Sequence, residues 1–374
     1  MISFDRTDQS VLAHWWWTID RWTVAAIALL IVFGAMLSLA ASPPVADRLG
    51  FDQYYFVRRQ MFFLPLAVAL LIAVSLLSPR GVKRLAAIIF GVGVLAVIAT
   101  LLFGTEIKGA RRWISLAGMT LQPSEFVKPC FAVVAAWLFS MRSENGRHSG
   151  RNASILLYGC LTGLLLMQPD VGMTVVVSAV WFTQFFLAGL PLIGVGFFVA
   201  AGVGAAIIGY FLFPHVASRI DRFIDPASGD SYQIARSMEA FTKGGAFGRG
   251  PGEGSVKSVL PDAHTDFVFA VAGEEFGLVA CLILVGLFAF VVLRGFGQII
   301  KEKDLFVLLA ATGLLVQFGL QALVNMGSTL RLMPTKGMTL PFISYGGSSL
   351  VAIALCMGML LALTRRRVGQ DQVR

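Results

Sequence analysis

The chain has 374 residues, of which 57% are hydrophobic and 14% charged, and its mean hydropathy is +0.77. A soluble protein of this length cannot bury that much apolar surface in one core. Apolar runs near the roughly 18–20 residues that cross a bilayer recur, which also excludes a β-barrel of alternating strands. The net charge of +9 is scattered over short loops without a nucleic-acid-binding motif, so no nucleic acid is expected as a partner, and an anionic membrane surface or lipid substrate is favoured.

The beginning of the chain mixes charges with a tryptophan cluster, Trp15 to Trp17, and lacks an h-region and a cleavage site. We interpret residues 1–21 as a cytoplasmic segment that ends in an interfacial tryptophan belt. The cysteines lie inside apolar runs, which favours small-residue packing over a disulfide framework. They are Cys130, Cys160, Cys281 and Cys356.

The apolar runs, taken in chain order, predict an all-α, polytopic integral membrane protein with about ten transmembrane helices. Their approximate ranges are 22–42, 60–78, 85–104, 123–140, 153–168, 171–188, 191–213, 266–293, 305–326 and 344–363. Clusters of Lys and Arg near residues 80–84, 142–151 and 294–303 predict that the N- and C-termini are cytoplasmic. We therefore expect one membrane domain, 22–363, and a short basic cytoplasmic tail, 364–374.

One long extracytoplasmic loop, residues 214–262, is predicted between spans 7 and 8. Its many cations oppose the usual cytoplasmic bias of Lys and Arg, which indicates a polyanionic ligand on the outer face. Within the loop, Tyr232 to Thr242 places Ile234, Met238 and Phe241 at helical spacing, which predicts a short helix on the membrane. The segment GGAFGRGPGEG that follows lacks the pattern of a nucleotide-binding loop.

The stretch LPDAHTDFVFAVAGEEFG opens the eighth apolar run with charged residues. On a helix, one face of this stretch is small and acidic: Asp262, Asp266, Ala270, Gly273 and Gly277. Glu274 would lie to the side of this face and Glu275 almost opposite. We therefore expect Asp266 to face an outer groove and meet substrate, while acids that complement a helix dipole are the alternative. Asp262 and His264 are candidate substrate contacts, and His264 with Asp266 alone makes no metal site.

A second group of candidates lies within KGARRWISLAGMTLQPSEFVK. Pro123 is predicted to begin a helix on which Glu125 and Lys128 pair just inside the membrane. Ionisable groups at that depth are functional by default, and a structural ion pair is the alternative. Three residues that precede this pair are expected either to bind a phosphate and a sugar or lipid edge, or to anchor the loop at the interface. They are Arg111, Arg112 and Trp113.

Two further stretches break the apolar pattern. In LLMQPDVGMT, Asp170 is predicted to cap a helix after a tight hairpin between two spans. In RLMPTKGMTLPFISYGGSS, residues 331–349, prolines and glycines predict non-helical backbone before the last span, which membrane depth tolerates only when it is buried in protein or lines a wet cavity. The chain has no motif of a serine hydrolase, a zinc protease or a nucleotide-driven pump.

Five segments together resemble the SEDS family (shape, elongation, division and sporulation), which polymerises peptidoglycan in bacteria. They are KGARRWI, LQPSEFVKP, QPDVGMT, AFTKGGAFGRGPGEGSVKSVLPDAHTDFVFAVAGEEFG and MPTKGMTLPFISYGGSS. The last segment is more similar to the cell-division branch (FtsW type) than to the elongation branch.

The resemblance implies a glycosyltransferase that polymerises lipid II, a disaccharide-pentapeptide on undecaprenyl diphosphate, during septal synthesis at the outer face of the inner membrane. It implies that Asp266 is the essential aspartate, that Glu125 and Lys128 are the buried pair of the fourth span, and that Trp113 is the tryptophan of the R-W-I motif. The implied partners are a class B transpeptidase and other division proteins.

This reaction suits an outer face with cations and a carboxylate. Asp266 is expected to be the general base or to orient the acceptor hydroxyl. A divalent cation, Mg²⁺ or Mn²⁺, is the candidate cofactor, with Asp266 as its ligand, and no organic cofactor is expected. The expected diphosphate-binding cations are Arg111, Arg112, Arg219, Arg249 and Lys257. Two other functions stay open: a transporter that flips lipid II, suited by Glu125 and Lys128, and a non-catalytic scaffold for the transpeptidase.

Overall fold

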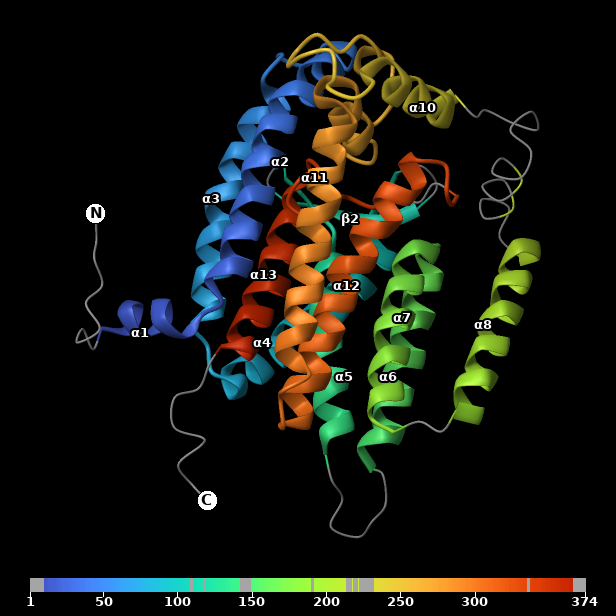
Figure 1. Cartoon of the computed structure of the whole chain (residues 1–374). Helices are drawn as coiled ribbons and strands as arrows, with labels where there is room; N and C mark the ends of the chain where they lie inside the picture. Colours follow the sequence, from blue (N-terminus) through green and yellow to red (C-terminus); the bar gives the residue numbers. More distant parts are fainter. Residues whose placement is uncertain are drawn as a thin grey trace.

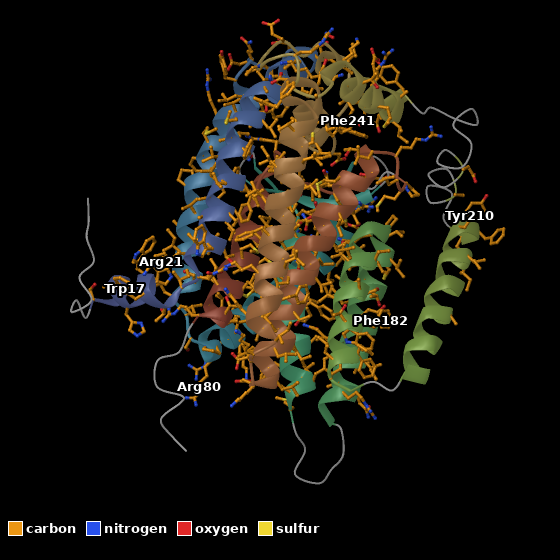
Figure 2. All side chains as sticks on the ribbon, in the orientation of Figure 1. Trp17, Arg21, Arg80, Phe182, Tyr210 and Phe241 are labelled. Carbon is orange, nitrogen blue, oxygen red and sulfur yellow. The ribbon has the colours of Figure 1, made fainter. Side chains whose placement is uncertain are left out.

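The computed structural model describes residues 10–107, 110–116, 119–141, 149–189, 192–212, 217, 221, 232–334 and 337–365. They form a bundle of long helices (Figure 1). We call the end of the bundle that holds α1 (Val11–Thr18) the inner end, and the end that holds α10 (Tyr232–Gly244) the outer end. Figure 2 labels Arg21 and Arg80 at the inner end and Phe241 at the outer end.

A helix occupies each of the ten predicted ranges. These helices are α2 (Arg21–Arg48), α3 (Tyr55–Ser75), α4 (Pro79–Phe103), α5 (Pro123–Ser140), α6 (Ser149–Met167), α7 (Val171–Leu187), α8 (Leu192–Leu212), α11 (Val268–Ile299), α12 (Leu305–Thr329) and α13 (Gly347–Thr364). Within the described residues, six helices are long and apolar enough to cross a membrane: α2, α3, α4, α11, α12 and α13. The helical membrane fold is thus confirmed, while the number of spans stays a prediction.

Local chemistry explains where several helices begin. Proline stands at the first turn of α4 and α5, where its missing N–H costs no hydrogen bond. Asp170 accepts a hydrogen bond from the N–H of Met173 at 3.1 Å, which confirms the predicted cap of α7. Asp304 caps α12 in the same way through the N–H groups of Phe306 and Val307.

The core of the bundle is built around α12 and α13, which are the most buried of the long apolar helices. α13 packs on α3, and α12 packs on α5, α7 and α11. Because α12 is surrounded by protein, it can carry polar residues that a lipid-facing helix could not.

The inner end joins the beginning and the end of the described chain. Trp15 donates its Nε1–H to the Ser75 hydroxyl at 2.8 Å, and Arg365 donates to the carbonyl of Ser75 at 3.4 Å. Arg294 binds Asp20 through two hydrogen bonds of 2.6 Å. Burial raises the pKa of the Asp20 carboxyl, but the hydrogen bonds from Arg294 outweigh it and bring the pKa to about 2. Both ends of the described chain therefore lie on one side, as an even number of spans requires.

A small antiparallel sheet at the outer end was not predicted. It consists of β1 (Thr105–Ile107), β2 (Ala110–Leu116) and β3 (Met119–Leu121), in the order β1-β2-β3. Its central strand carries Arg111, Arg112 and Trp113. The sequence of β2, ARRWISL, alternates too weakly for its period of two residues to stand out.

The outer ends of α10 and α11 differ from the predictions in detail. The helix predicted at 232–242 is present, but it packs on α11 through Ala240 and Gly244, and leaves Met238 exposed. The Ser237 hydroxyl donates to the carbonyl of Thr329, at the end of α12, at 2.7 Å. A Cβ at Gly244 would lie 1.9 Å from the carbonyl oxygen of Gly273, so only glycine permits this approach.

The predicted acidic face of α11 is wrong, because the helix begins at Val268 rather than at Asp266. Residues 261–267 are turns, and Asp262 has φ 52°, a left-handed conformation that aspartate tolerates. The carbonyl of Asp262 accepts hydrogen bonds from the N–H groups of Thr265 and Asp266, both at 3.1 Å. Asp262 and Asp266 therefore lie on a turn that precedes the helix.

Candidate active site

Asp266 lies half-buried at the outer end, in the turn before α11. Its carbonyl accepts a hydrogen bond from Asn325 Nδ2 at 3.0 Å. A Cβ at Gly337 would lie 3.1 Å from Asp266 Oδ2, so the backbone of the segment before α13 passes directly against the carboxylate. Non-helical backbone from two distant parts of the chain thus meets at this aspartate.

Two amide side chains of α12 connect Asp266 to the centre of the bundle. Asn325 Nδ2 also donates to the carbonyl of Met338 at 2.6 Å, and Gln321 Nε2 donates to the carbonyl of Thr339 at 3.0 Å. Gln321 Oε1 accepts from Lys128 Nζ at 3.0 Å. Gln321 and Asn325 are four residues apart and share a helix face, so one face of α12 carries both links.

These amides were missed in the sequence, although a signal for them exists. Gln317, Gln321 and Asn325 recur every four residues within an otherwise apolar helix. Polar side chains repeated on one face of a membrane helix indicate a buried polar network.

The predicted pair of Glu125 and Lys128 forms on α5. Lys128 Nζ lies 3.0 Å from Glu125 Oε2, at i,i+3 spacing. Lys128 is buried and Glu125 is partly exposed, so the pair is reachable from the carboxylate side. Through Gln321 and Asn325 it belongs to the same polar network as Asp266.

Arg112 is engaged by the protein itself, and its binding of a diphosphate stays a prediction. It donates to the carbonyls of Gln168 at 3.1 Å and Pro169 at 2.5 Å, and lies 3.6 Å from the carboxylate of Asp170. It therefore fastens β2 to the connection between α6 and α7. Arg111 is exposed and pairs with Glu106 at 3.5 Å, so it stays available to an anion. Trp113 is half-buried beside it on β2.

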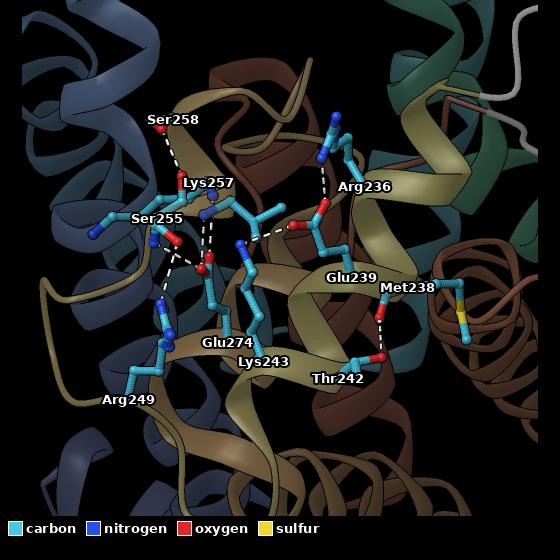
Figure 3. Close-up of polar contacts among 11 residues, drawn as sticks. Arg236, Met238, Glu239, Thr242, Lys243, Arg249, Ser255, Lys257, Ser258 and Glu274 are labelled. Carbon is cyan, nitrogen blue, oxygen red and sulfur yellow. Dashed lines mark hydrogen bonds and ion pairs between the residues drawn. The ribbon is translucent and has the colours of Figure 1, made fainter.

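Glu274 and Glu275 hold the loop that returns from α10, as Figure 3 shows for Glu274. Glu274 Oε1 accepts from the N–H groups of Ser255 and Val256, both at 2.7 Å, and Oε2 accepts from the N–H of Lys257 at 3.0 Å. Glu275 forms an ion pair with Lys257 Nζ. The two adjacent glutamates are thus buried because they satisfy a loop, which answers why an apolar helix carries them.

The prediction that Lys257 holds a diphosphate is therefore corrected. Its ammonium is buried, paired with Glu275 and hydrogen-bonded to the carbonyl of Gly252 at 3.1 Å. Arg249 is exposed and contacts the Ser255 hydroxyl at 3.2 Å, so it stays a candidate (Figure 3). Arg219 lies outside the described residues.

His264 belongs to an aromatic cluster rather than to a substrate surface. Its ring is buried, 4.6 Å from the ring of Phe56 and 5.3 Å from that of Tyr345. Burial, with a contribution from Arg48, lowers the pKa of His264 to about 4, so the ring is neutral at pH 7. The prediction of His264 as a substrate contact is corrected, whereas Asp262 stays half-buried in the turn beside Asp266.

The cluster also fixes the turn that carries Asp266. Tyr345 donates its N–H to the carbonyl of His264 at 2.9 Å, and the Ser344 hydroxyl donates to the carbonyl of Thr265 at 2.6 Å. The segment before α13 is therefore bonded to two adjacent carbonyls of the turn, directly before Asp266.

The described residues contain no group of three or more His, Cys, Asp or Glu side chains that could hold a metal ion by themselves. Mg²⁺ is often bound by one or two protein carboxylates together with substrate phosphates and water. The single carboxylate of Asp266 fits that second kind of site, in which a diphosphate completes the coordination.

Residues 21–368 match the model of the cell cycle protein family of FtsW, RodA and SpoVE. The chain belongs to this family. A protein of Caulobacter vibrioides (strain NA1000 / CB15N), named as a probable peptidoglycan glycosyltransferase FtsW, is 47% identical over 372 residues. The alignment covers 98% of this chain and 94% of the relative. A protein of the same name from Coxiella burnetii (strain RSA 493 / Nine Mile phase I) is 36% identical over 363 residues, with 93% of this chain and 96% of the relative covered.

Solved structures of the family have the same fold. One, from a study of how a peptidoglycan synthase complex coordinates polymerization and crosslinking, has a TM-score of 0.76 at 30% identity and covers 92% of this chain and 97% of its own. The rod shape determining protein RodA of Thermus thermophilus has a TM-score of 0.67 at 28% identity, with 93% and 97% covered. The resemblance to the SEDS family and its FtsW branch is thus confirmed.

Proposed function

We propose that this family member, a peptidoglycan glycosyltransferase of the inner membrane, polymerises lipid II at its outer end with Asp266 as the catalytic carboxylate. Family membership and the names shared by its relatives establish the enzyme class. The proposal for Asp266 rests on one observation: its half-buried carboxylate lies against the backbone of Gly337, in a turn that Asn325 holds to the centre of the bundle. A fixed carboxylate at a basic outer face is what proton removal from a sugar hydroxyl requires.

In the proposed step, one bond forms at C1 of the donor sugar and one bond breaks there. The oxygen of the acceptor sugar hydroxyl attacks C1 of the donor sugar, and its proton passes to a carboxylate oxygen of Asp266. The bond between C1 and the phosphate oxygen breaks, and its electron pair leaves with undecaprenyl diphosphate. The proton on Asp266 then returns to solvent at the outer face.

Exposed cations are the proposed ligands of the two lipid diphosphates. Arg111 on β2 and Arg249 in the loop after α10 are exposed at the outer end. Arg219 precedes α10 in the sequence and belongs to the same predicted extracytoplasmic stretch, 214–262. Guanidinium groups bind phosphate oxygens with paired hydrogen bonds. When bound, a divalent cation would stabilise the charge of the leaving diphosphate, with Asp266 as its protein ligand.

We also assign Glu125, Lys128 and Trp113 to the substrate site. The buried ammonium of Lys128 is tied through Gln321 to the segment that approaches Asp266. The partly exposed Glu125 presents the pair to a bound sugar or lipid, and Trp113 offers an aromatic face. Asp262, whose carbonyl accepts a hydrogen bond from the N–H of Asp266 at 3.1 Å, is proposed as a neighbouring contact.

The proposed partner is a class B transpeptidase that crosslinks the new glycan strands, and the proposed location is the division septum. The likeness to a chain from a peptidoglycan synthase complex supports such a partner. The relatives named FtsW support the assignment to division.

Transport of lipid II is the second candidate, because buried polar atoms lie deep within the bundle. Gln184 Oε1 and Gln317 Oε1 are buried without a hydrogen-bond partner, and Lys128 is buried as well. Such groups also suit a translocation path.

One experiment separates the two functions. The purified chain, with its transpeptidase partner, is reconstituted with fluorescent lipid II and Mg²⁺ or Mn²⁺. Chain length is read on a gel, and accessibility of the label to a membrane-impermeant quencher reports transfer between leaflets. Long glycan strands support the polymerase, whereas quencher access without any polymer supports transport. Neither product, with partner still bound, supports a scaffold.

A further inference from the structure

Helix α11 is interrupted at Gly277, whose backbone has φ 77° and ψ −175°. In an uninterrupted α-helix, the N–H of Leu278 would donate to the carbonyl of Glu274, and the N–H of Val279 to that of Glu275. In this structure, Leu278 donates instead to the carbonyl of Gly245 at 2.9 Å, and Val279 to that of Ala246 at 3.1 Å.

The carbonyls of Glu274 and Glu275, which lose these helical donors, accept hydrogen bonds from the same loop. Glu274 O accepts from the N–H of Arg249, and Glu275 O from the N–H of Gly250, both at 3.0 Å. Residues 245–250, called the inserted loop below, thus replace both helical hydrogen bonds with four of their own. The N–H groups of Leu278 and Val279 and the carbonyls of Glu274 and Glu275 are therefore all paired, as burial inside a membrane protein demands.

Glycine makes this insertion possible on both sides. A Cβ at Gly277 would lie 2.3 Å from the backbone nitrogen of Gly248, and a Cβ at Gly248 would lie 2.1 Å from the carbonyl oxygen of Glu275. Both glycines have positive φ, 77° and 82°. The carboxylate of Glu274, on the last turn before the break, then holds the continuation of the loop at residues 255–257.

We propose that the inserted loop sets the position of Asp266, and that Gly277 and Glu274 are positioning residues for the transfer reaction. The inference rests on the proposed function. Residues 268–276 of α11 carry the turn with Asp266 at their outer end. If the loop leaves, Gly277 is free to adopt helical angles, and the helix closes through the bonds from Leu278 and Val279 to Glu274 and Glu275. That closure turns the outer segment relative to the rest of α11, and moves Asp266 away from Gly337 and Asn325.

The test is Gly277→Ala, with Gly286→Ala as its matched control on the same helix. A Cβ at Gly286 has nothing within 4 Å, so the control adds the same methyl group without a clash. Gly277→Ala is expected to lower kcat for lipid II polymerisation about 100-fold, with KM changed less than about twofold, because a misplacement near 1 Å costs that much. Gly286→Ala is expected to match wild type in both.

Hydrogen–deuterium exchange supplies a readout that a general loss of structure does not give. In Gly277→Ala, amides of residues 245–257 are expected to exchange faster, while those of residues 278–285 stay protected because they rejoin a continuous helix. If Gly277→Ala keeps wild-type protection over residues 245–257, the proposal is overturned, whether or not kcat falls. The proposal is also overturned if the loop is released and kcat stays at the wild-type value.

Two further variants keep the test decisive if Gly277→Ala does not fold. Gly248→Ala places the same clash on the loop side, and its control is Gly252→Ala, where φ is 87° but a Cβ meets nothing within 4 Å. Glu274→Gln weakens the hold on residues 255–257 and leaves the break in place. Gly248→Ala and Glu274→Gln are both expected to lower kcat and to increase hydrogen exchange of the loop, and Gly252→Ala is not.

Asp266→Asn is measured beside these variants to separate the chemistry of Asp266 from the effect of the inserted loop. It is expected to lose activity while the inserted loop keeps wild-type exchange. Normal polymerisation by Asp266→Asn would remove that residue from the chemistry. The exchange and rates of Gly277→Ala against Gly286→Ala would still decide whether the inserted loop controls transfer.

Discussion

Two lysines of the described chain are buried beside a carboxylate, and their surroundings differ in one respect. Lys257 and Glu275 have side chains 8% and 0% exposed, and the remaining contact of the ammonium is a backbone carbonyl of its own loop. Lys128 and Glu125 have side chains 2% and 13% exposed, and Lys128 reaches Gln321, whose amide holds the segment beside Asp266. The first pair is closed on all sides, whereas the second, called the open pair, is partly exposed at Glu125 and is linked through Gln321 to the segment beside Asp266.

Under the proposed function, the difference separates a structural charge from a functional one. A closed, buried ion pair is replaceable by apolar side chains of similar size with little loss of stability, whereas removal of one partner leaves a buried charge without compensation. A pair that also contacts substrate cannot be replaced in this way, because its charges are needed after folding is complete. Burial alone therefore does not identify a functional lysine, and the contacts beyond the partner do.

The largest effect is expected at the open pair. Lys128→Met, Glu125→Met and the double variant should each lower the rate of glycan polymerisation by about 10²- to 10⁴-fold, since neither apolar side chain can contact a polar substrate. The measurement is the initial rate with labelled lipid II, with thermal unfolding in detergent as the control for folding. Recovery of the rate in the double variant would assign this pair to scaffolding as well.

The closed pair should give the opposite pattern. Lys257→Met and Glu275→Met alone are each expected to lower the free energy of unfolding by about 3–5 kcal/mol, and the double variant is expected to come within about 1 kcal/mol of wild type. Polymerisation by the double variant should stay near the wild-type rate. A stable double variant without activity would return Lys257 to the list of substrate ligands.

Acid sensitivity at the outer end should trace to His264. Its pKa is about 4 in the folded protein and near 6.5 when unfolded, so the unfolded chain binds the extra proton between these values. The stabilisation from a neutral His264 is complete above pH 6.5 and is lost as pH falls toward 4, by up to about 3 kcal/mol. His264→Phe keeps the ring contacts and should flatten this fall in thermal unfolding, while His14→Gln, at an exposed position, should not.

The smallest effect is expected from an exposed cation. Arg249→Gln should raise KM for lipid II by about fivefold at unchanged stability, because an exposed guanidinium contributes only about 1 kcal/mol to anion binding. Arg112→Gln, which breaks contacts within the protein, should instead lower the unfolding temperature. The reverse assignment of the two effects would mean that Arg112 is the substrate ligand.

The sequence predicted what depends on neighbours along the chain. The apolar runs located the helices because lipid and core both require apolar surface, and the cap at Asp170 and the pair of Glu125 with Lys128 follow from spacing within one turn. It did not predict the partners of Glu274 and Glu275, because those partners belong to a loop that lies 17–19 residues earlier in the chain and folds back onto α11. Lys257 was predicted to be a diphosphate ligand for the same reason, because its ion pair with Glu275 depends on the fold and not on local spacing.

The site itself was predicted in part. Asp266 was singled out, but the turn that carries it was expected to be helical. The helical spacing of the small residues after Asp266 also fits Asp266 and Asp262, so the pattern did not show where the helix begins. Gln321 and Asn325 were missed, as their function depends on the backbone of residues 337–339, which no local pattern brings to α12.

The central claim is that Asp266 performs the chemistry, and one measurement tests it most directly. Wild type, Asp266→Asn and Asp304→Asn, each purified with the transpeptidase partner, are compared for consumption of lipid II and glycan chain length. Asp304 only caps α12, and asparagine caps helices equally well, so Asp304→Asn controls for the substitution itself. The prediction is full-length glycan from wild type and Asp304→Asn, and none from a folded, partner-bound Asp266→Asn. Equal polymer from all three proteins would contradict it.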